Sequence, residues 1–351
     1  MSNVTLQHIT KHFKEVTALR DVSYTIQNGE FFVLLGPTGA GKTTTLRVIA
    51  GLEKQDEGSV LFDGEAFDGL PPADRDVAFV FQKYSLYPTL SVYDNLAFPL
   101  RSPMHRQPEA QVKASVERAA EILRITHLME RKTANLSGGE MQRVSIGRAI
   151  VREPRIFLMD EPLSNLDAKL RESLRVELKH LQKTLNTTTL FVTHDQVEAL
   201  TMADRIGVLD RGRLIQIGTP KDIYDRPGTI FVAQLVGTPR INLVDASRTD
   251  GSLVIERSPI RLPLPVERSL PDSFVLGVRP EHVQPHQQGE FTGKLALMEP
   301  LGVETILHIQ AGEQMLLSTM SGMVTHRLGD EIRFNVAREW LHFFGTDGTR
   351  I

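Results

Sequence analysis

Gly36-Pro37-Thr38-Gly39-Ala40-Gly41-Lys42-Thr43 matches the pattern G-x-x-x-x-G-K-[ST], and Thr44 follows it. The octapeptide comes after the apolar run Phe31–Leu35 and before a helical pattern at about Lys42–Ala50. Glycines let the backbone curl so that successive N–H groups and the helix N-terminus face phosphates. At average composition such an octapeptide arises by chance in about 1% of chains of this length. The sequence therefore predicts a nucleoside triphosphate site in which Lys42 reaches the β- and γ-phosphates and the Thr43 hydroxyl binds Mg²⁺.

Two acidic residues, Asp160 and Glu161, come directly after the apolar run Ile156–Met159. A buried strand presents carboxylates only at its end, and in an open α/β sheet ligands bind beside the carboxyl ends of the strands. We expect Asp160 to hold Mg²⁺, directly or through water, and Glu161 to polarise the attacking water. A solvated loop start with two acids is the alternative, and the phosphate loop in the same chain counts against it.

Short apolar runs alternate with helical stretches from about Val4 to Gly237, which predicts βα units around a mainly parallel sheet. The helix expected at about Glu109–Leu123 belongs to a helical insertion at about residues 85–152. Asp210–Arg213 carries the turn residues of a hairpin, so antiparallel strands should close this domain. The expected strands are Phe31–Leu35, Val77–Phe81, Ile156–Met159 and Thr189–Thr193.

The pattern changes at residue 237, which divides the chain into predicted domains 1–236 and 237–351. The second part has a single lysine, Lys294, and several clustered prolines. Its short apolar runs indicate a small β-barrel or sandwich. These runs include Phe274–Val278, Glu304–Ile309 and Ile332–Val336.

Composition limits the classes of function. The chain has 351 residues, a net charge of −3 and no cysteine, which excludes disulfides, thiol nucleophiles and thiolate metal sites. The acidic balance gives no support to nucleic-acid binding, which needs a basic surface. No apolar run approaches the roughly 20 residues that span a bilayer, and the first residues lack a secretory pattern. We expect a chain that does not cross a membrane by its own segments.

Four further motifs follow in a fixed order, and with them the chain resembles the ATP-binding subunit of an ABC transporter. Each has an ordinary alternative when taken alone: the glutamine is usually just solvated, the Leu-Ser-Gly-Gly string is usually a helix start, and the histidine is usually structural. Their joint occurrence carries the resemblance, which implies an α/β P-loop ATPase domain with a helical subdomain. The motifs are Gln82 after Val80-Phe81, Leu136-Ser137-Gly138-Gly139-Glu140, Ser164-Asn165-Leu166-Asp167, and His194 after Leu190–Thr193.

The resemblance also implies roles for these residues. Gln82 would contact Mg²⁺ or the attacking water, and His194 would contact the γ-phosphate. Phe13, after Thr10-Lys11-His12, is placed like the aromatic residue that stacks on adenine, although a core or rim phenylalanine fits the spacing equally well. The residues that would complete the nucleotide site of a partner subunit are Ser137, Gly138, Gly139, Glu140 and Asp167.

Glu140 departs from the commonest form of the signature motif, which ends in glutamine. Ser137-x-x-Glu140 still forms a capping-box pattern before Met141–Ile150, so the helix start should be kept. An added carboxylate near a γ-phosphate would nevertheless oppose closure driven by ATP. We therefore expect Glu140 to tune the ATPase.

The resemblance implies partners as well, because the signature of one subunit completes the ATP site of the other. It implies a head-to-tail homodimer, two transmembrane permease subunits and, indirectly, a solute-binding protein, with the chain peripheral at the cytoplasmic face of the inner membrane. The permeases would dock near Gln82 and the segment 83–88, whose aromatic residues fit the core of the helical subdomain equally well.

A closer resemblance, over nearly the whole chain, is to the maltose- and glycerol-phosphate-type importer ATPases. It rests on residues 81–88, 160–167 and 193–199 and on Gly277–His282 in the tail. In these importers the tail is an oligonucleotide-binding-like regulatory fold, able to receive an inhibitory protein and without a nucleic-acid partner. Arg279, Glu281 and His282 also fit a purely structural turn. Importers of iron, sulfate or polyamines, soluble ABC proteins of DNA repair or translation, and an ATPase that times binding to a partner stay as alternatives.

Overall fold

The computed structural model describes residues 2–103, 106–263 and 270–351, which form two compact units, residues 1–220 and 221–351. The boundary between the units precedes the predicted boundary at residue 237. Helices α7 (Pro220–Asp225) and α8 (Ile230–Leu235) account for the difference. Ala233 and Ile230 of α8 pack with Phe344, so this helix shares a small core with strands of the second unit.

A six-stranded sheet, in the order β10-β9-β3-β8-β7-β6, forms the centre of the first unit. Its inner strands are parallel, and β10 closes it antiparallel to β9 as the turn at Asp210–Arg213 predicts. β3 and β8 are buried along their whole length, as expected for parallel strands covered on both faces. The bounds are β3 Phe31–Leu35, β6 Val77–Val80, β7 Ile156–Asp160, β8 Thr189–Thr193, β9 Arg205–Asp210 and β10 Arg213–Gly218.

The first unit also has an antiparallel sheet, β2-β1-β4-β5, that the sequence-based expectation of a mainly parallel domain did not include. Two residues join β1 to β2, too few for the crossover that a parallel pair needs. Helix α1 (Lys42–Ala50) packs between this sheet and the central one, because its buried face shares one core with both. The bounds are β1 Val4–Phe13, β2 Val16–Ile26, β4 Glu57–Phe62 and β5 Glu65–Ala66.

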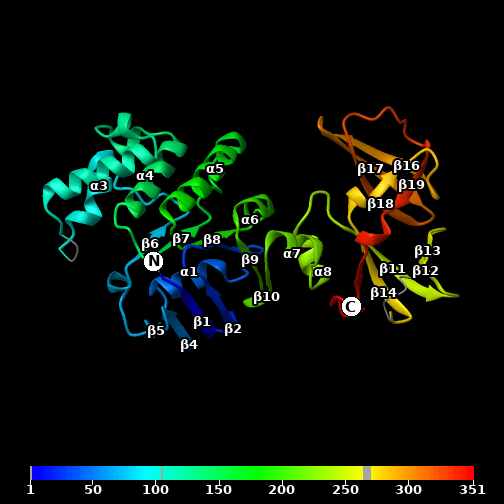
Figure 1. The fold of residues 1–351 in the computed structure, drawn as a ribbon, viewed down its shortest axis with the longest axis horizontal. Coiled ribbons are helices and arrows are strands. Elements are labelled where there is room, and N and C mark those ends of the chain that lie inside the picture. Colours follow the sequence, from blue (N-terminus) through cyan, green and yellow to red (C-terminus); the bar gives the residue numbers. More distant parts are fainter. Residues whose placement is uncertain (1, 104–105, 264–269) are drawn as a thin grey trace. The chain divides into compact units, whose positions relative to one another are not determined.

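Between β6 and β7 the described residues form helices, as the predicted helical insertion requires. Figure 1 shows α3 and α4 side by side at the far side of the central sheet from the antiparallel sheet. Helix α3 buries Val112, Val116 and Ala119, the stripe expected from the sequence. The remaining helices of the first unit are α2 Val92–Ala97, α3 Glu109–Ile122, α4 Gly138–Ile150, α5 Ala168–Leu185 and α6 Gln196–Met202.

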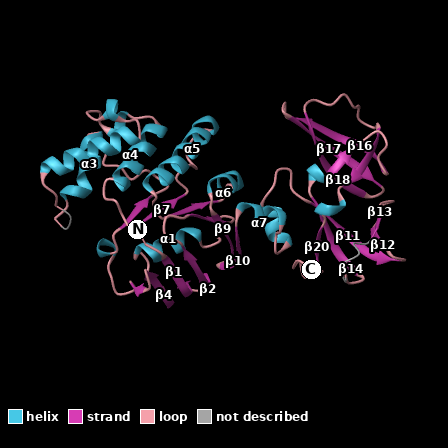
Figure 2. Ribbon diagram, viewed as in Figure 1, coloured by secondary structure: helices cyan, strands magenta, loops and turns pink. Residues whose placement is uncertain are grey.

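The second unit is built on two five-stranded antiparallel sheets, β13-β12-β11-β14-β20 and β15-β19-β16-β17-β18 (Figure 2). Side chains from both sheets enclose one apolar core that includes Leu276, Leu307 and Phe334. This confirms the expected all-β character of the tail. The bounds are β11 Asn242–Thr249, β12 Ser252–Ile255, β13 Arg261–Pro263, β14 Ser273–Val278, β15 Val283–Pro285, β16 Phe291–Pro300, β17 Glu304–Ala311, β18 Gln314–Ser321, β19 Glu331–Val336 and β20 His342–Phe344.

Arg279, from the tail motif Gly277–His282, has a structural role within the second unit. Its side chain is 1% exposed and donates hydrogen bonds to the carbonyl oxygens of Val236 (2.8 Å) and Tyr224 (2.7 Å). The Tyr224 hydroxyl donates in turn to Glu281 at 2.6 Å. These bonds tie α7 and the end of α8 to β14, and they favour the structural explanation of this motif.

Within the residues that the structure describes, no helix combines the length and the apolar character that crossing a bilayer requires.

Candidate functional site

The phosphate loop connects β3 to α1 and takes its shape from two glycines. Gly41 has φ 106°, a left-handed conformation that strains other residues. A Cβ on Gly36 would lie 2.2 Å from the Leu209 carbonyl oxygen, so no larger residue fits there. The loop therefore needs glycine at both positions, and it leaves the N-terminus of α1 without a side-chain cap.

Lys42 is held at the first position of α1 by the loop that precedes it. Its side chain is 5% exposed, and Nζ donates to the carbonyl oxygens of Gly36 (2.9 Å) and Pro37 (3.0 Å). Burial lowers the pKa of Lys42, and the nearby Glu161 carboxylate opposes that shift. An ammonium group kept at the loop in this way is placed to meet a phosphate.

A cavity of about 670 Å³ opens beside the loop, within the size range of small-molecule sites. Backbone and side chains of Thr38, Gly39 and residues 41–44 line it, together with Gln82 and Glu161. Gly36, Pro37 and Ala40 were predicted to bind the ligand but do not line this cavity. The carbonyls of the first two hold Lys42, and Ala40 packs in the core.

Thr43 and Asp160 come together as the sequence predicts. The Thr43 hydroxyl donates to Asp160 Oδ1 at 2.9 Å, and burial raises the pKa of Asp160. A hydroxyl and a carboxylate oxygen are the hard ligands that Mg²⁺ prefers, and Mg²⁺ takes its other ligands from phosphate and water. These two residues therefore fit a magnesium ion bound together with a nucleotide.

Glu161 lies at the centre of a polar cluster that it forms with Lys42, Gln82 and His194. It has φ 44° directly after β7, a left-handed conformation that is uncommon outside glycine. Oε1 lies 3.6 Å from Lys42 Nζ, and Oε2 lies 3.1 Å from His194 Nδ1 and 3.5 Å from Gln82 Nε2. The ends of β6, β7 and β8 thus bring Gln82, Glu161 and His194 together, as predicted.

The signature residues lie elsewhere in the same unit. Ser137 caps α4: its hydroxyl accepts from the Glu140 N–H at 3.4 Å, while Glu140 Oε2 accepts from the Ser137 N–H and hydroxyl, both at 2.7 Å. These bonds lower the pKa of Glu140 and confirm the predicted capping box. Asp167 caps α5 by accepting from the Leu170 N–H at 3.0 Å. Residues 137–140 and Asp167 do not line the cavity beside Lys42.

Five cavity residues were not anticipated from the sequence: Val16, Thr17, Ala18, Arg20 and Arg211. Val16 is 66% exposed, whereas Phe13, the expected adenine platform, is 40% exposed and outside this cavity. Arg20 N donates a hydrogen bond to Gly212 O, and Gly212 N donates one to Ala40 O. These two bonds place the neighbouring Arg211 beside the phosphate loop. Residues from β2 and the β9–β10 turn meet here by tertiary contact, so no local motif marks them.

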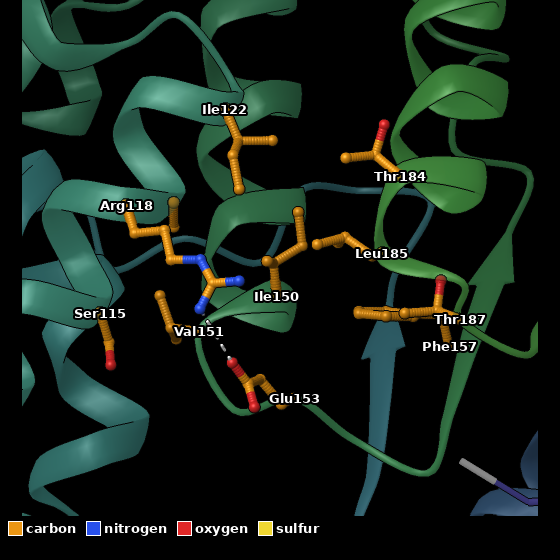
Figure 3. A pocket seen from close by; sticks show the side chains of 11 residues that line it. Ser115, Arg118, Ile122, Ile150, Val151, Glu153, Phe157, Thr184, Leu185 and Thr187 are labelled. Carbon is orange, nitrogen blue, oxygen red and sulfur yellow. Dashed lines mark ion pairs between the residues drawn. The ribbon is translucent and has the colours of Figure 1, made fainter.

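A second pocket, of about 250 Å³, lies between α3, the end of α4 and the end of α5 (Figure 3). Its wall combines polar side chains with apolar ones, of which Ile122, Ile150 and Leu185 face the space. Arg118 at its edge points toward Glu153, at 3.6 Å. It has no phosphate loop and no carboxylate beside a hydroxyl, so the nucleotide chemistry belongs to the cavity at Lys42.

Comparison with known proteins agrees with this geometry. The family model for the ABC transporter matches residues 19–164, and the TOBE domain model matches residues 276–344. The sn-glycerol-3-phosphate import ATP-binding protein of Psychromonas ingrahamii is 42% identical over 360 residues, covering 100% of this chain and 95% of the relative. This chain belongs to the ABC transporter ATP-binding proteins. The trehalose/maltose import ATP-binding protein of Thermococcus litoralis is 43% identical over 371 residues, covering 98% of each.

Solved ABC cassettes share the fold of the first unit. A dimeric cassette in a post-hydrolysis state, bound to ADP and phosphate, is 31% identical and covers 62% of this chain and 98% of its own, with a TM-score of 0.56. A nucleotide-free cassette is 28% identical and covers 68% and 100%, with a TM-score of 0.59. This ABC protein is therefore an ATPase that energises transport, with an α/β cassette followed by a β-rich TOBE domain.

Proposed function

We propose that the chain is the ATP-hydrolysing subunit of an importer for a sugar or sugar derivative, such as an oligosaccharide, polyol, glycerol phosphate or sulfonated sugar. The observation that carries the proposal is the polar cluster around one cavity, with Glu161 within reach of Lys42, Gln82 and His194. Relatives named for the import of glycerol phosphate and of trehalose or maltose match along the full length, which supports the solute class.

The chain's own groups account for hydrolysis. Lys42 and the loop N–H groups bind the β- and γ-phosphates, and Thr43 with Asp160 and Gln82 would hold Mg²⁺, which neutralises phosphate charge. Glu161 accepts a proton from the attacking water, while Gln82 and His194 keep its carboxylate oriented. His194, whose ring is 53% exposed, is positioned to turn from Glu161 to the γ-phosphate. Phe13 is the proposed contact of the adenine ring.

The separation of the two sets of residues supports a head-to-tail homodimer. Ser137, Gly138, Gly139, Glu140 and Asp167 do not line the cavity beside Lys42 of their own chain. The N-terminus of α4, a helix of 13 residues, is a suitable site for a γ-phosphate held by another subunit. ATP would bridge the two subunits, and its hydrolysis would remove the bridge and let them separate.

Two transmembrane permease subunits would receive this motion at an aromatic surface near Gln82. Tyr87 and Phe98 are 40% and 47% exposed, with ring centres 4.5 Å apart, and Phe81 is 37% exposed. Contiguous exposed apolar groups are a feature of protein–protein interaction sites, which supports docking here. A solute-binding protein would act through the permeases, a regulatory protein would bind the tail, and the chain would lie at the cytoplasmic face of the inner membrane.

Reconstitution with permeases tests the function. We expect the ATPase rate of the assembled complex to rise several-fold when a solute-binding protein carries a sugar, polyol or glycerol phosphate, because solute binding is coupled to closure of the ATPase dimer. The rate is measured as phosphate release from proteoliposomes. Stimulation only by proteins loaded with iron, sulfate or a polyamine would contradict the solute class, and an ATPase that no permease affects would contradict the transport role.

Glu140→Gln should lower the ATP concentration needed for half-maximal activity about five- to tenfold. Glutamine still accepts the bond from the Ser137 N–H, while the carboxylate that would face a partner's γ-phosphate loses its negative charge. Steady-state ATPase assays over a range of ATP concentrations measure the effect. Glu130→Gln, an exposed acid in the same subdomain, is the matched control. An ATP dependence identical to that of the unmodified protein would refute the tuning role.

A further inference from the structure

A pocket of about 430 Å³ lies within the second unit and shares no lining residue with the nucleotide cavity. Helix α7, the turn Arg338–Trp340, the start of β20 and the C-terminal segment form its wall. All of its lining residues fall between residues 221 and 350, so this unit builds the pocket without the first. Its volume suits a small organic molecule.

The charges that line this pocket cancel. Lys221 is paired with Asp225, and the remaining charges are distributed along α7, the turn and the C-terminal segment. A net charge of zero provides no long-range attraction for phosphate or another anion, whereas many charged groups disfavour an apolar guest. The wall offers both donors and acceptors, as hydroxyl groups require. The bases are Lys221, Arg226 and Arg350, and the acids are Asp222, Asp225 and Glu339.

Trp340 supplies an aromatic surface beside these charges. Its indole stacks on the His282 ring, with centres 5.2 Å apart and planes 14° apart, and 41% of it is exposed. An indole is large, rigid and apolar on its faces, so it packs well against the C–H face of a sugar or the carbon chain of a polyol. The stack on His282 fixes the orientation of the ring before any ligand arrives.

His342 adds a buried polar group that the described residues leave unsatisfied. It is 3% exposed and lines the pocket, and its Nδ1 has no hydrogen-bond partner in the described part of the chain. Burial lowers its pKa to about 4, so the ring is neutral at pH 7. Nδ1 itself is inaccessible, so His342 contributes a neutral part of the wall, and Nδ1 is not a hydrogen-bonding partner for a ligand.

We propose that this pocket binds a neutral polyhydroxyl compound, a sugar or a polyol, with its carbon face on Trp340 and its hydroxyls among Lys221 and Glu339. The site is separate from the nucleotide cavity, and its occupancy needs neither ATP nor a permease. The proposal therefore stands or falls independently of the transport function.

Trp340 is the single tryptophan of the chain, so its fluorescence reports on this pocket directly. The full-length protein, without nucleotide, is titrated with maltose and with sorbitol, and with glucose 6-phosphate and inorganic phosphate as charged probes. Calorimetry follows the same titrations. We expect a saturable change in emission and a matching heat with maltose or sorbitol. No saturable binding of either neutral probe at millimolar concentrations, or binding of the charged probes alone, would overturn the proposal.

Two variants locate the site. Trp340→Ala and Glu339→Gln should each weaken binding of the neutral probe about tenfold by calorimetry, because one removes the stacking surface and the other a charged acceptor. Glu339 is exposed, so its replacement leaves the fold intact. Glu313→Gln removes an equally exposed acid outside the pocket and should change nothing. Binding that survives in both pocket variants would place the ligand elsewhere and refute the assignment.

Discussion

Glu161→Gln should lower the rate of ATP hydrolysis about a thousandfold and leave ATP binding nearly unchanged. The carboxylate lies 3.6 Å from Lys42 Nζ and 3.1 Å from His194 Nδ1, where it can take a proton from water beside a γ-phosphate. Glutamine keeps the shape of the side chain but cannot act as that base, and positioned general bases contribute about 10²- to 10⁴-fold. Single-turnover hydrolysis of labelled ATP measures the loss.

The same variant should accumulate as a dimer when ATP is present, because the nucleotide that bridges the subunits is no longer consumed. Analytical ultracentrifugation with ATP and with ADP measures this directly. Glu172→Gln, an exposed acid on α5, is the control and should hydrolyse ATP at the normal rate. If Glu161→Gln turned ATP over normally, Glu161 could not be the base.

Lys42→Ala should weaken ATP binding about a hundredfold. The ammonium group is 5% exposed and held by two loop carbonyls, so its bonds to phosphate are formed without much further ordering of the side chain. Bonds to charged groups are worth about 1.5–3 kcal/mol each, and the lysine meets more than one phosphate oxygen. Equilibrium binding of a fluorescent ATP analogue measures the affinity.

Lys294→Ala is the matched control, since it removes an exposed lysine of the second unit. Its affinity for ATP should equal that of the unmodified protein. The thermal unfolding of Lys42→Ala should be recorded as well, because Lys42 also bonds to the loop carbonyls. A folded Lys42→Ala protein with normal ATP affinity would contradict the role of the phosphate loop.

Local sequence patterns were sufficient to predict the strands that hold the nucleotide-binding residues. Phe31–Leu35 and Thr189–Thr193 were predicted to the residue because parallel strands buried on both faces are continuous apolar runs. The antiparallel sheet was missed because its strands show no equivalent run. β1 and β2 bury only part of their residues, and their pairing has several register shifts.

The polar cluster could be predicted in part for a similar reason. Gln82, Glu161 and His194 each follow a strand of one parallel sheet, and the carboxyl ends of such strands meet at one edge. Sequence spacing gave no indication that Arg211 would join the cavity or that Phe13 would lie outside it. Those positions depend on how the β1–β2 hairpin and the β9–β10 turn pack against the loop.

Gly36–Thr43 and the acids Asp160 and Glu161 at the end of β7 were thus enough to predict a phosphate-binding site, because glycine geometry, charge and strand ends are local properties. The ABC family was expected from the resemblance that the ordered motifs carry. Three-dimensional packing established the rest: the centring of the cluster on Glu161, the place of Arg211 at the cavity, and the pocket around Trp340. Each of these joins residues through side-chain direction and burial. The direction and the burial of these side chains are determined only when segments distant in the sequence pack together and exclude water. No single stretch of sequence encodes them.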